Sequence, residues 1–134
     1  MTDSQISAKR ILIAEDETLI RMDLAEMLKE SGYEVIAEAT NGEEAIALAS
    51  ELKPDLAILD VKMPKMDGIS AAEVIVKTSP VLMLTAFSQK ELVERALDAG
   101  VMAYVVKPFT IDDLIPAIEI ATARYQQLVA LQAE

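Results

Sequence analysis

Several side chains that could take part in chemistry follow directly after short apolar runs of the sequence. In chain order they are two acids, an aspartate, a threonine and a lysine: Glu15, Asp16, Asp60, Thr85 and Lys107. Carboxylates are hard oxygen ligands of the kind that Mg²⁺ takes, and they leave positions on the ion for phosphate oxygens. Lysine supplies a positive charge for a phosphoryl group, threonine supplies a hydroxyl donor, and the Asp60 carboxylate can be phosphorylated without a base to activate it. These residues predict Mg²⁺-dependent phosphoryl chemistry at Asp60.

Each of these residues also has an ordinary structural explanation when it is taken alone. An acid after a strand often begins a polar turn, and a lysine there is often only solvated. Two carboxylates about 5 Å apart repel by about 3 kcal/mol at an effective dielectric of about 20, so a cluster of them is unfavourable unless a cation lies among them. Their joint occurrence after four apolar runs favours the functional interpretation.

Composition restricts the chemistry and the partners that remain. The chain has 134 residues, enough for one domain with a substantial core, and 52% of them are hydrophobic. It has no cysteine and no histidine, which excludes disulfides, zinc clusters, catalytic triads and histidine general bases. Its formal charge of −11 opposes direct binding of nucleic acid and favours a divalent cation or a partner with a basic or apolar face.

The sequence shows no sign of a membrane segment. Charges or proline interrupt the apolar stretches before the roughly 18 residues that a membrane span needs, and Met1–Lys9 lacks the basic and apolar regions of a signal peptide. We therefore expect no membrane partner and a cytoplasmic location.

Five runs of β-favouring residues alternate with segments of helical length. The runs are Ile11–Ala14, Val35–Glu38, Leu56–Leu59, Val81–Leu84 and Ala103–Val106. Strands that alternate with helices lie parallel and are covered on both faces, which explains their nearly continuous hydrophobicity. With right-handed crossovers, the sequence predicts a doubly wound α/β fold with a five-stranded parallel sheet in the flavodoxin-like order 2-1-3-4-5. Ligands of such sheets bind beyond the carboxyl ends of the strands, where the candidate residues fall.

The predicted helices have recognisable ends. Gly32 suits the left-handed position that closes the first helix. Capping pairs are expected at the starts of the second, fourth and fifth helices: Asn41 with Glu44, Ser88 with Glu91, and Thr110 with Asp113.

Four motifs along the chain resemble those of response-regulator receiver domains, the phosphoacceptor half of two-component signalling. They are "ILIAEDE", "LAILDVKMPKMDG", "LMLTAF" and "AYVVKPF", and the likeness extends from Lys9 to about Arg124. It implies a signalling switch that takes a phosphoryl group from a sensor histidine kinase or a phosphotransfer protein, with Mg²⁺ as cofactor. A receiver domain is a phosphoacceptor and not an enzyme in the usual sense.

The resemblance implies a role for each candidate residue at the site. Asp60 would be the phosphoacceptor. Asp16 and Asp60 would bind Mg²⁺ directly, Glu15 through water, and Lys62 through its backbone carbonyl.

The resemblance also implies the parts of a switch. Thr85 would be the switch hydroxyl, Lys107 would bind the phosphoryl group, and Tyr104 would be the aromatic side chain that turns inward on activation. The Lys107-Pro108 bond would be cis, as X-Pro bonds sometimes are. The signal would pass through the face made by helix 4, strand 5 and helix 5.

The chain departs from the family in two places and has a narrower likeness in a third. The segment between Asp60 and Thr85 is a few residues shorter than usual, which predicts a short third helix. Met102 and Ala103 replace acids that many DNA-binding relatives use to dimerise through the same face. The stretches "LIRMDLAEML", "TAFSQKELVERA" and "DDLIPAIEIA" resemble receivers of regulators whose separate module binds RNA in antitermination, although this acidic domain is not expected to bind RNA itself.

Three parts of the chain are expected: a flexible tail at 1–8, the receiver domain at 9–124 and a helical extension at 125–134. Apolar residues at spacings of three and four form a heptad-like seam in the last helix, and a receiver core can cover only its first part: Ile111, Leu114, Ile118, Ala121, Tyr125 and Leu128. The extension could pair with a second chain or lead to an output module. A homodimer through helix 4, strand 5 and helix 5 is the other dimer considered.

Two other functions fit the sequence less well than the switch. A Mg²⁺-dependent phosphohydrolase with an aspartyl-phosphate intermediate would need a second aspartate two positions after Asp60, where Lys62 stands. A flavodoxin-like electron carrier would need a hydroxyl-rich phosphate loop after the first strand, where the acids Glu15 and Asp16 stand.

Overall fold

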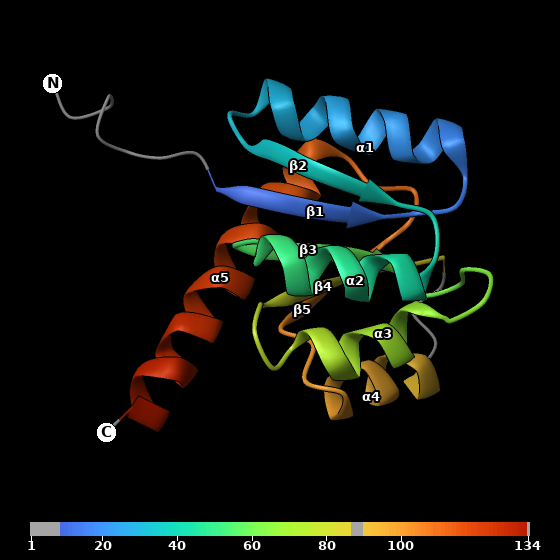
Figure 1. Ribbon diagram of the computed structural model, residues 1–134. Coiled ribbons are helices and arrows are strands. Elements are labelled where there is room, and N and C mark those ends of the chain that lie inside the picture. The colour runs from blue at the N-terminus through green and yellow to red at the C-terminus, as the bar shows by residue number, and fades with distance from the viewer. Residues whose placement is uncertain (1–8, 87–89, 134) are drawn as a thin grey trace, which may run out of the picture.

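The computed structural model describes residues 9–86 and 90–133, in which five strands alternate with five helices (Figure 1). The strands are β1 (Arg10–Ala14), β2 (Glu34–Ala39), β3 (Leu56–Asp60), β4 (Val81–Thr85) and β5 (Ala103–Val106). The helices are α1 (Thr18–Glu30), α2 (Gly42–Leu52), α3 (Gly68–Ile75), α4 (Lys90–Asp98) and α5 (Ile111–Ala133). The expected tail at 1–8 and the predicted cap at Ser88 lie outside the described residues.

All strands of the sheet are parallel, and their order is β2-β1-β3-β4-β5, which confirms the predicted topology. The chain leaves β1 toward β2 on one side of the sheet and returns to β3 on the other. The carboxyl ends of β1 and β3 are therefore neighbours at the point where the connections diverge, which is where ligands bind in this class of fold.

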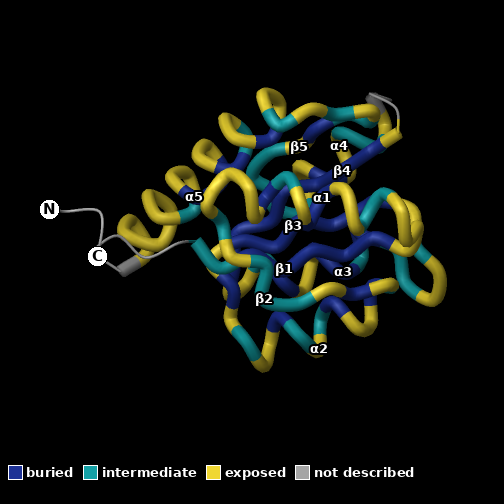
Figure 2. The backbone as a smooth tube through the Cα atoms, turned by 90° about the horizontal axis from the view of Figure 1, so that it is seen from above, coloured by how far each residue is buried: buried dark blue, intermediate teal, exposed yellow. Residues whose placement is uncertain are grey.

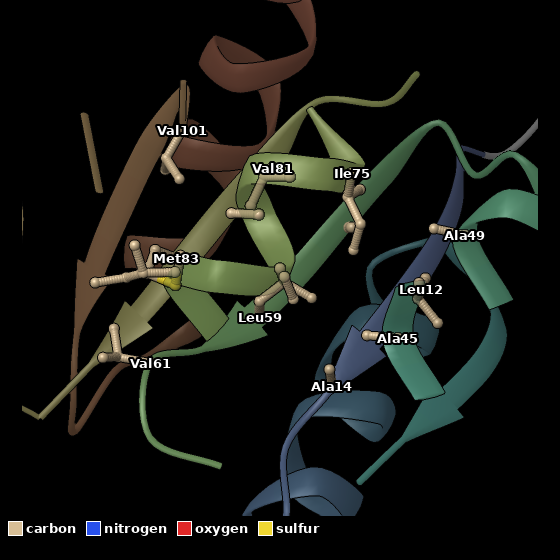
Figure 3. Packing of buried hydrophobic residues seen from close by; sticks show 14 of the residues in the cluster. Leu12, Ala14, Ala45, Ala49, Leu59, Val61, Ile75, Val81, Met83 and Val101 are labelled. Atoms are coloured by element: carbon tan, nitrogen blue, oxygen red, sulfur yellow. The ribbon is translucent and has the colours of Figure 1, made fainter. Parts of the chain in front are cut away.

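Side chains alternate between the two faces of the sheet, and each face has its own cluster of buried residues. On β1, Leu12 and Ala14 pack with residues of α2, α3 and α4, whereas Ile11 and Ile13 pack with residues of α1 and α5. Figure 3 shows the first cluster from close by. In the view from above, β1, β3 and β4 run as buried segments between exposed helix surfaces (Figure 2). This layering holds the strand ends, and hence the candidate site residues, in fixed positions.

Helix ends follow the predicted chemistry where the structure describes them. Gly32, just after α1, has a φ of +94°, a left-handed conformation that L side chains rarely adopt. The Asn41 side chain accepts a 2.8 Å hydrogen bond from the Glu44 amide at the start of α2. The Thr110 amide donates to the Asp113 carboxylate at 3.0 Å before α5. The eight residues of α3 confirm the predicted short helix.

Helix α5 is 23 residues long and only partly covered by the sheet. Leu114, Ile118 and Ala121 are fully buried. Its last turns extend past the sheet (Figures 1 and 2), and there Leu128 is 42% exposed and Leu131 is 70% exposed. The seam is therefore buried in its first part only, as expected. No helix in the described ranges is both long enough and apolar enough to cross a membrane.

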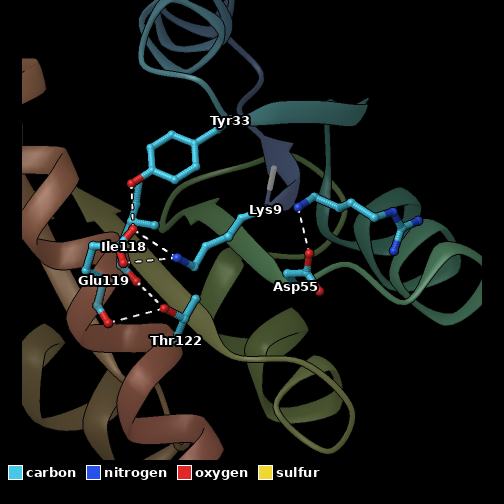
Figure 4. Close-up of polar contacts among 7 residues, drawn as sticks. Lys9, Tyr33, Asp55, Ile118, Glu119 and Thr122 are labelled. Carbon is cyan, nitrogen blue, oxygen red and sulfur yellow. Dashed lines mark hydrogen bonds and ion pairs between the residues drawn. The ribbon is translucent and has the colours of Figure 1, made fainter. Parts of the chain in front are cut away.

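Glu119, in the middle of α5, bonds this helix to residues at the amino-terminal edge of the sheet (Figure 4). Its carboxylate accepts hydrogen bonds from the Lys9 ammonium at 3.0 Å and from the Tyr33 hydroxyl at 2.8 Å. Burial of Tyr33, together with this hydrogen bond, raises its pKa to about 12. The contact lies at the end of the sheet opposite the candidate site and fixes α5 against β1 and β2.

Candidate functional site

The candidate residues meet at the carboxyl edge of the sheet. Glu15 and Asp16 follow β1 directly, and Asp60 is the last residue of β3. Oxygens of these three carboxylates lie within 4.8 Å of one another. The predicted clustering of the acids is therefore present.

Lys107 joins two of these acids. Its Nζ lies 2.8 Å from Glu15 Oε1 and 2.9 Å from Asp60 Oδ1. The Glu15 side chain is fully buried, and its second oxygen accepts a 3.1 Å hydrogen bond from the Glu17 amide. Three acids and one ammonium leave the site with a net charge of about −2, a balance that favours a divalent cation.

Burial and neighbouring charges shift the protonation equilibria of this group. Burial is the largest cause that raises the pKa of Asp60, to about 6; the hydrogen bond from Lys107 lowers it, and the Glu15 and Asp16 charges raise it. For Lys107, burial opposes the charged form, but hydrogen bonds to Glu15 and Asp60 outweigh burial and raise its pKa. Without a metal ion, the site therefore disfavours the charged form of Asp60 and favours that of Lys107.

Replacing Asp60 with asparagine should stabilise the metal-free protein at neutral pH. The pKa of Asp60 is raised from its ordinary 3.8 to about 6. The stability that its protonated form contributes is thus complete below pH 3.8 and is lost as the pH rises through about 6. Calorimetry in a chelator should show the advantage of Asp60→Asn growing across this range and disappearing below it. A lower melting temperature than wild type at pH 7 would contradict clustering of the charges.

The donor set fits Mg²⁺. The side-chain donors of the cluster are all carboxylate oxygens, which this hard cation prefers, and Asp16 is exposed so that waters can complete the coordination. A cavity of about 140 Å³ adjoins Asp60 and is lined also by Lys62, Thr85 and Lys107. It offers room for a phosphoryl group next to the carboxylates.

The other predicted residues take different positions. Thr85, the last residue of β4, is 4% exposed and borders the cavity beside Asp60, and Lys62 lies in the loop after β3. Tyr104 is 42% exposed on β5, and it lines a groove along α5 instead of the cavity beside Asp60. The Lys107-Pro108 bond is cis, as expected.

The structure adds features of the β3–α3 loop that the sequence did not predict. A Cβ atom at Gly68 would overlap the backbone oxygen of Asp60, and one at Gly42 would overlap that of Met66. The Asp67 side chain accepts a 2.8 Å hydrogen bond from the Ser70 amide and so caps α3. An aspartate before the predicted third helix was the available signal for this cap. The two glycines let the loop pass close to the site.

Comparison with known proteins agrees with this geometry. The family model of the response regulator receiver domain matches residues 11–119 of the sequence. The chain is 62% identical over 128 residues to the transcriptional regulatory protein PdtaR of Mycobacterium tuberculosis, with 94% of this chain and 62% of that protein covered. It is 40% identical over 113 residues to the chemotaxis protein CheY of Thermotoga maritima, with 82% of this chain and 94% of CheY covered.

A solved structure shares the fold over most of the chain. The CheY-like response regulator receiver domain protein of Methanospirillum hungatei gives a TM-score of 0.81 at 31% identity, covering 90% of this chain and 98% of that one. The chain thus spans nearly all of the single-domain relatives but only 62% of the length of PdtaR. The match over residues 11–119, together with the strand order and the acidic cluster, shows that this chain belongs to the receiver domains of two-component response regulators.

Proposed function

We propose that Asp60 accepts a phosphoryl group from a sensor histidine kinase or a phosphotransfer protein. The phosphorus–nitrogen bond of the donor phosphohistidine breaks and its electron pair returns to the histidine nitrogen, while a carboxylate oxygen of Asp60 forms the new phosphorus–oxygen bond. The observation that carries this proposal is the position of the Asp60 carboxylate, 2.9 Å from the Lys107 ammonium and beside two further acids. Under this proposal, the transfer from the kinase to Asp60 takes place in the cytoplasm.

Four groups would hold the Mg²⁺ that the reaction needs. Asp16 and Asp60 would bind it directly, Glu15 through water, and Lys62 through its backbone carbonyl. When bound, the ion neutralises negative charge that gathers between the phosphoryl oxygens and the carboxylates. Lys107 already stands at the site as a positive charge for the same oxygens.

Activation would then change the face made by α4, β5 and α5. Thr85 would donate a hydrogen bond to a phosphoryl oxygen, and Tyr104 would turn from its exposed position toward the space that Thr85 leaves, a population shift between two packings. A groove of about 820 Å³ on this face, lined in part by Tyr104 and Ile120, supports its use as the output surface.

The phosphohydrolase alternative has less support. The family match is to phosphoacceptor signalling modules, and Lys62 occupies the position where that class of enzyme needs an acid. Self-catalysed phosphorylation from small donors and loss of the phosphoryl group to water remain part of the proposed switch.

The role of Asp16 gives a direct test of the metal site. Asp16→Asn should lower Mg²⁺ affinity by at least the roughly 10- to 100-fold that loss of an outer-shell partner costs, because a direct ligand is removed. Phosphorylation should fall with it. Titration calorimetry measures the affinity, and Asp23→Asn, an equal change of charge at an exposed position of α1, is the control. Unchanged affinity in Asp16→Asn would place the ion elsewhere.

The output of this domain is proposed from its likeness to longer regulators. The likeness to receivers of antitermination regulators supports a role as the receiver part of such a protein, with RNA bound by a separate module. The charge of −11 argues against contact of RNA with this domain itself.

We also propose that the chain divides into a receiver domain at 9–124 and a helical extension at 125–134 that pairs with a second copy. Leu128→Lys with Leu131→Lys should convert a dimer into a monomer in sedimentation experiments, because both side chains are exposed along the end of α5. Gln127→Lys with Gln132→Lys adds the same charge at other exposed positions and should leave the dimer intact. If the wild-type chain is monomeric at high concentration, with and without phosphorylation, the pairing proposal is wrong. The extension would then serve only to lead to an output module.

A further inference from the structure

We propose that Arg21 is a positioning residue for the metal site, an inference that rests on the proposed binding of Mg²⁺ by Glu15, Asp16 and Asp60. Arg21 lies in α1 and contacts none of the phosphoryl-binding residues in the described contacts. Its Nη1 donates a 2.8 Å hydrogen bond to the backbone oxygen of Glu15. Its Nε donates at 3.2 Å to the carboxylate of Glu38 on β2. One guanidinium thus joins the segment after β1 to the neighbouring strand.

The hydrogen bond from Arg21 to the Glu15 carbonyl is separated from the ligand residue Asp16 by a single peptide unit. That carbonyl belongs to the planar group that also carries the Asp16 amide, so its direction sets where the Asp16 backbone starts. On the other side of Glu15, the amide donates to the Ala39 oxygen at 3.0 Å. Hydrogen bonds therefore fix both the amide and the carbonyl of Glu15. The bond from Arg21 is the one nearer to Asp16.

The geometry favours arginine, because Nη1 and Nε are separate donors that each reach a different acceptor. The guanidinium is planar and presents its donors in a fixed fork, so it can satisfy two acceptors on different elements at once. The Arg21 side chain is 15% exposed, which limits the alternative positions that it can take. Lysine at this position would keep the charge but would offer one nitrogen where the guanidinium places two separate nitrogens at the two acceptors.

Charge and position predict opposite effects, which makes the proposal testable. A positive charge near three acids weakens the attraction of the site for a cation, so removal of the charge alone would strengthen Mg²⁺ binding. Loss of the hold on the Glu15–Asp16 peptide would weaken it, because the ligands would have to be ordered when the ion binds. An increase in Mg²⁺ affinity on replacing Arg21 would show that its charge dominates, and a decrease would show that its positioning role dominates.

Titration calorimetry of the full chain with MgCl₂ tests this with three variants. Arg21→Ala should bind Mg²⁺ about tenfold more weakly than wild type, in the range found for outer-shell partners. Arg21→Lys should also bind more weakly although its charge is kept. Glu38→Gln keeps an acceptor for Nε and leaves the Glu15 contact in place, so its affinity should stay close to that of wild type.

A measurement without metal separates positioning from general loss of structure. In metal-free protein, amide NMR shifts of Asp16 and Glu17 should change in both Arg21 variants and remain in place in Glu38→Gln. Arg21→Lys provides this readout even where Arg21→Ala unfolds. Equal or tighter Mg²⁺ binding by the Arg21 variants would overturn the proposal while leaving the metal site standing. A wild-type chain that binds no Mg²⁺ would overturn the proposed metal site and this inference with it.

Discussion

Intact-mass spectrometry of the chain treated with acetyl phosphate and Mg²⁺ should show one added phosphoryl group, and Asp60→Asn should show none. The Asp60 carboxylate lies 2.9 Å from a lysine ammonium and beside the carboxylates proposed to hold the ion, so a nucleophile, a cation and a metal site come together there. An amide oxygen at this position is a poor nucleophile and cannot form the acyl phosphate. The expected effect is complete loss of the added mass.

Asp67→Asn is the matched control for this experiment. Asp67 lies in the same loop and caps α3, and asparagine caps a helix about as well as aspartate. This variant should therefore keep both its fold and its phosphorylation. Equal labelling of Asp60→Asn, or an unchanged mass of wild type, would show that Asp60 is not the phosphoacceptor.

Gly68→Ala should destabilise the protein by roughly 1–3 kcal/mol or more, the usual cost of forcing an extra group into a packed site. A Cβ atom there would overlap the backbone oxygen of Asp60, and backbone atoms cannot move aside as a flexible side chain would. Urea denaturation should show the loss as a lower midpoint. Phosphorylation should also slow, because the loop that must shift follows Asp60 directly.

Gly32→Ala separates steric overlap from backbone strain. Gly32 has a φ of +94°, but a Cβ atom there would meet no described atom within 4 Å. Its replacement should cost about 1–2 kcal/mol through the left-handed conformation and leave phosphorylation unchanged. If Gly68→Ala were as stable as wild type, the close approach of the loop to Asp60 would be wrong.

The sequence predicted the sheet well because each strand is an apolar run bounded by short loops. The observed strands differ from the predicted ones only at their ends: β1 gains Arg10, β2 gains Glu34 and Ala39, β3 gains Asp60 and β4 gains Thr85. Strand order followed from parallel pairing and the handedness of the connections. The acidic cluster followed in turn, because parallel strands end at one edge.

The contacts between the site residues could not be predicted in the same way. That Lys107 bridges Glu15 and Asp60 depends on side-chain conformations at the ends of three strands, and composition carries no information on them. The close approach of Gly68 to Asp60 depends in the same way on the path of the whole loop between β3 and α3. Arg21 is one of several charged residues on α1, and the sequence does not indicate its two acceptors, Glu15 and Glu38.

The separate clusters on the two faces of the sheet have a consequence for how this chain tolerates variation. Leu24 and Ile118 belong to one cluster, Ala72 and Met83 to the other, and the backbone of the sheet stands between them. Substitutions on opposite faces share no side-chain partner, so their costs in unfolding free energy should simply add. Each face can therefore be remodelled independently. A lineage can alter the surface of α1 and α5 for a new partner while the packing of α2, α3 and α4 stays as it is.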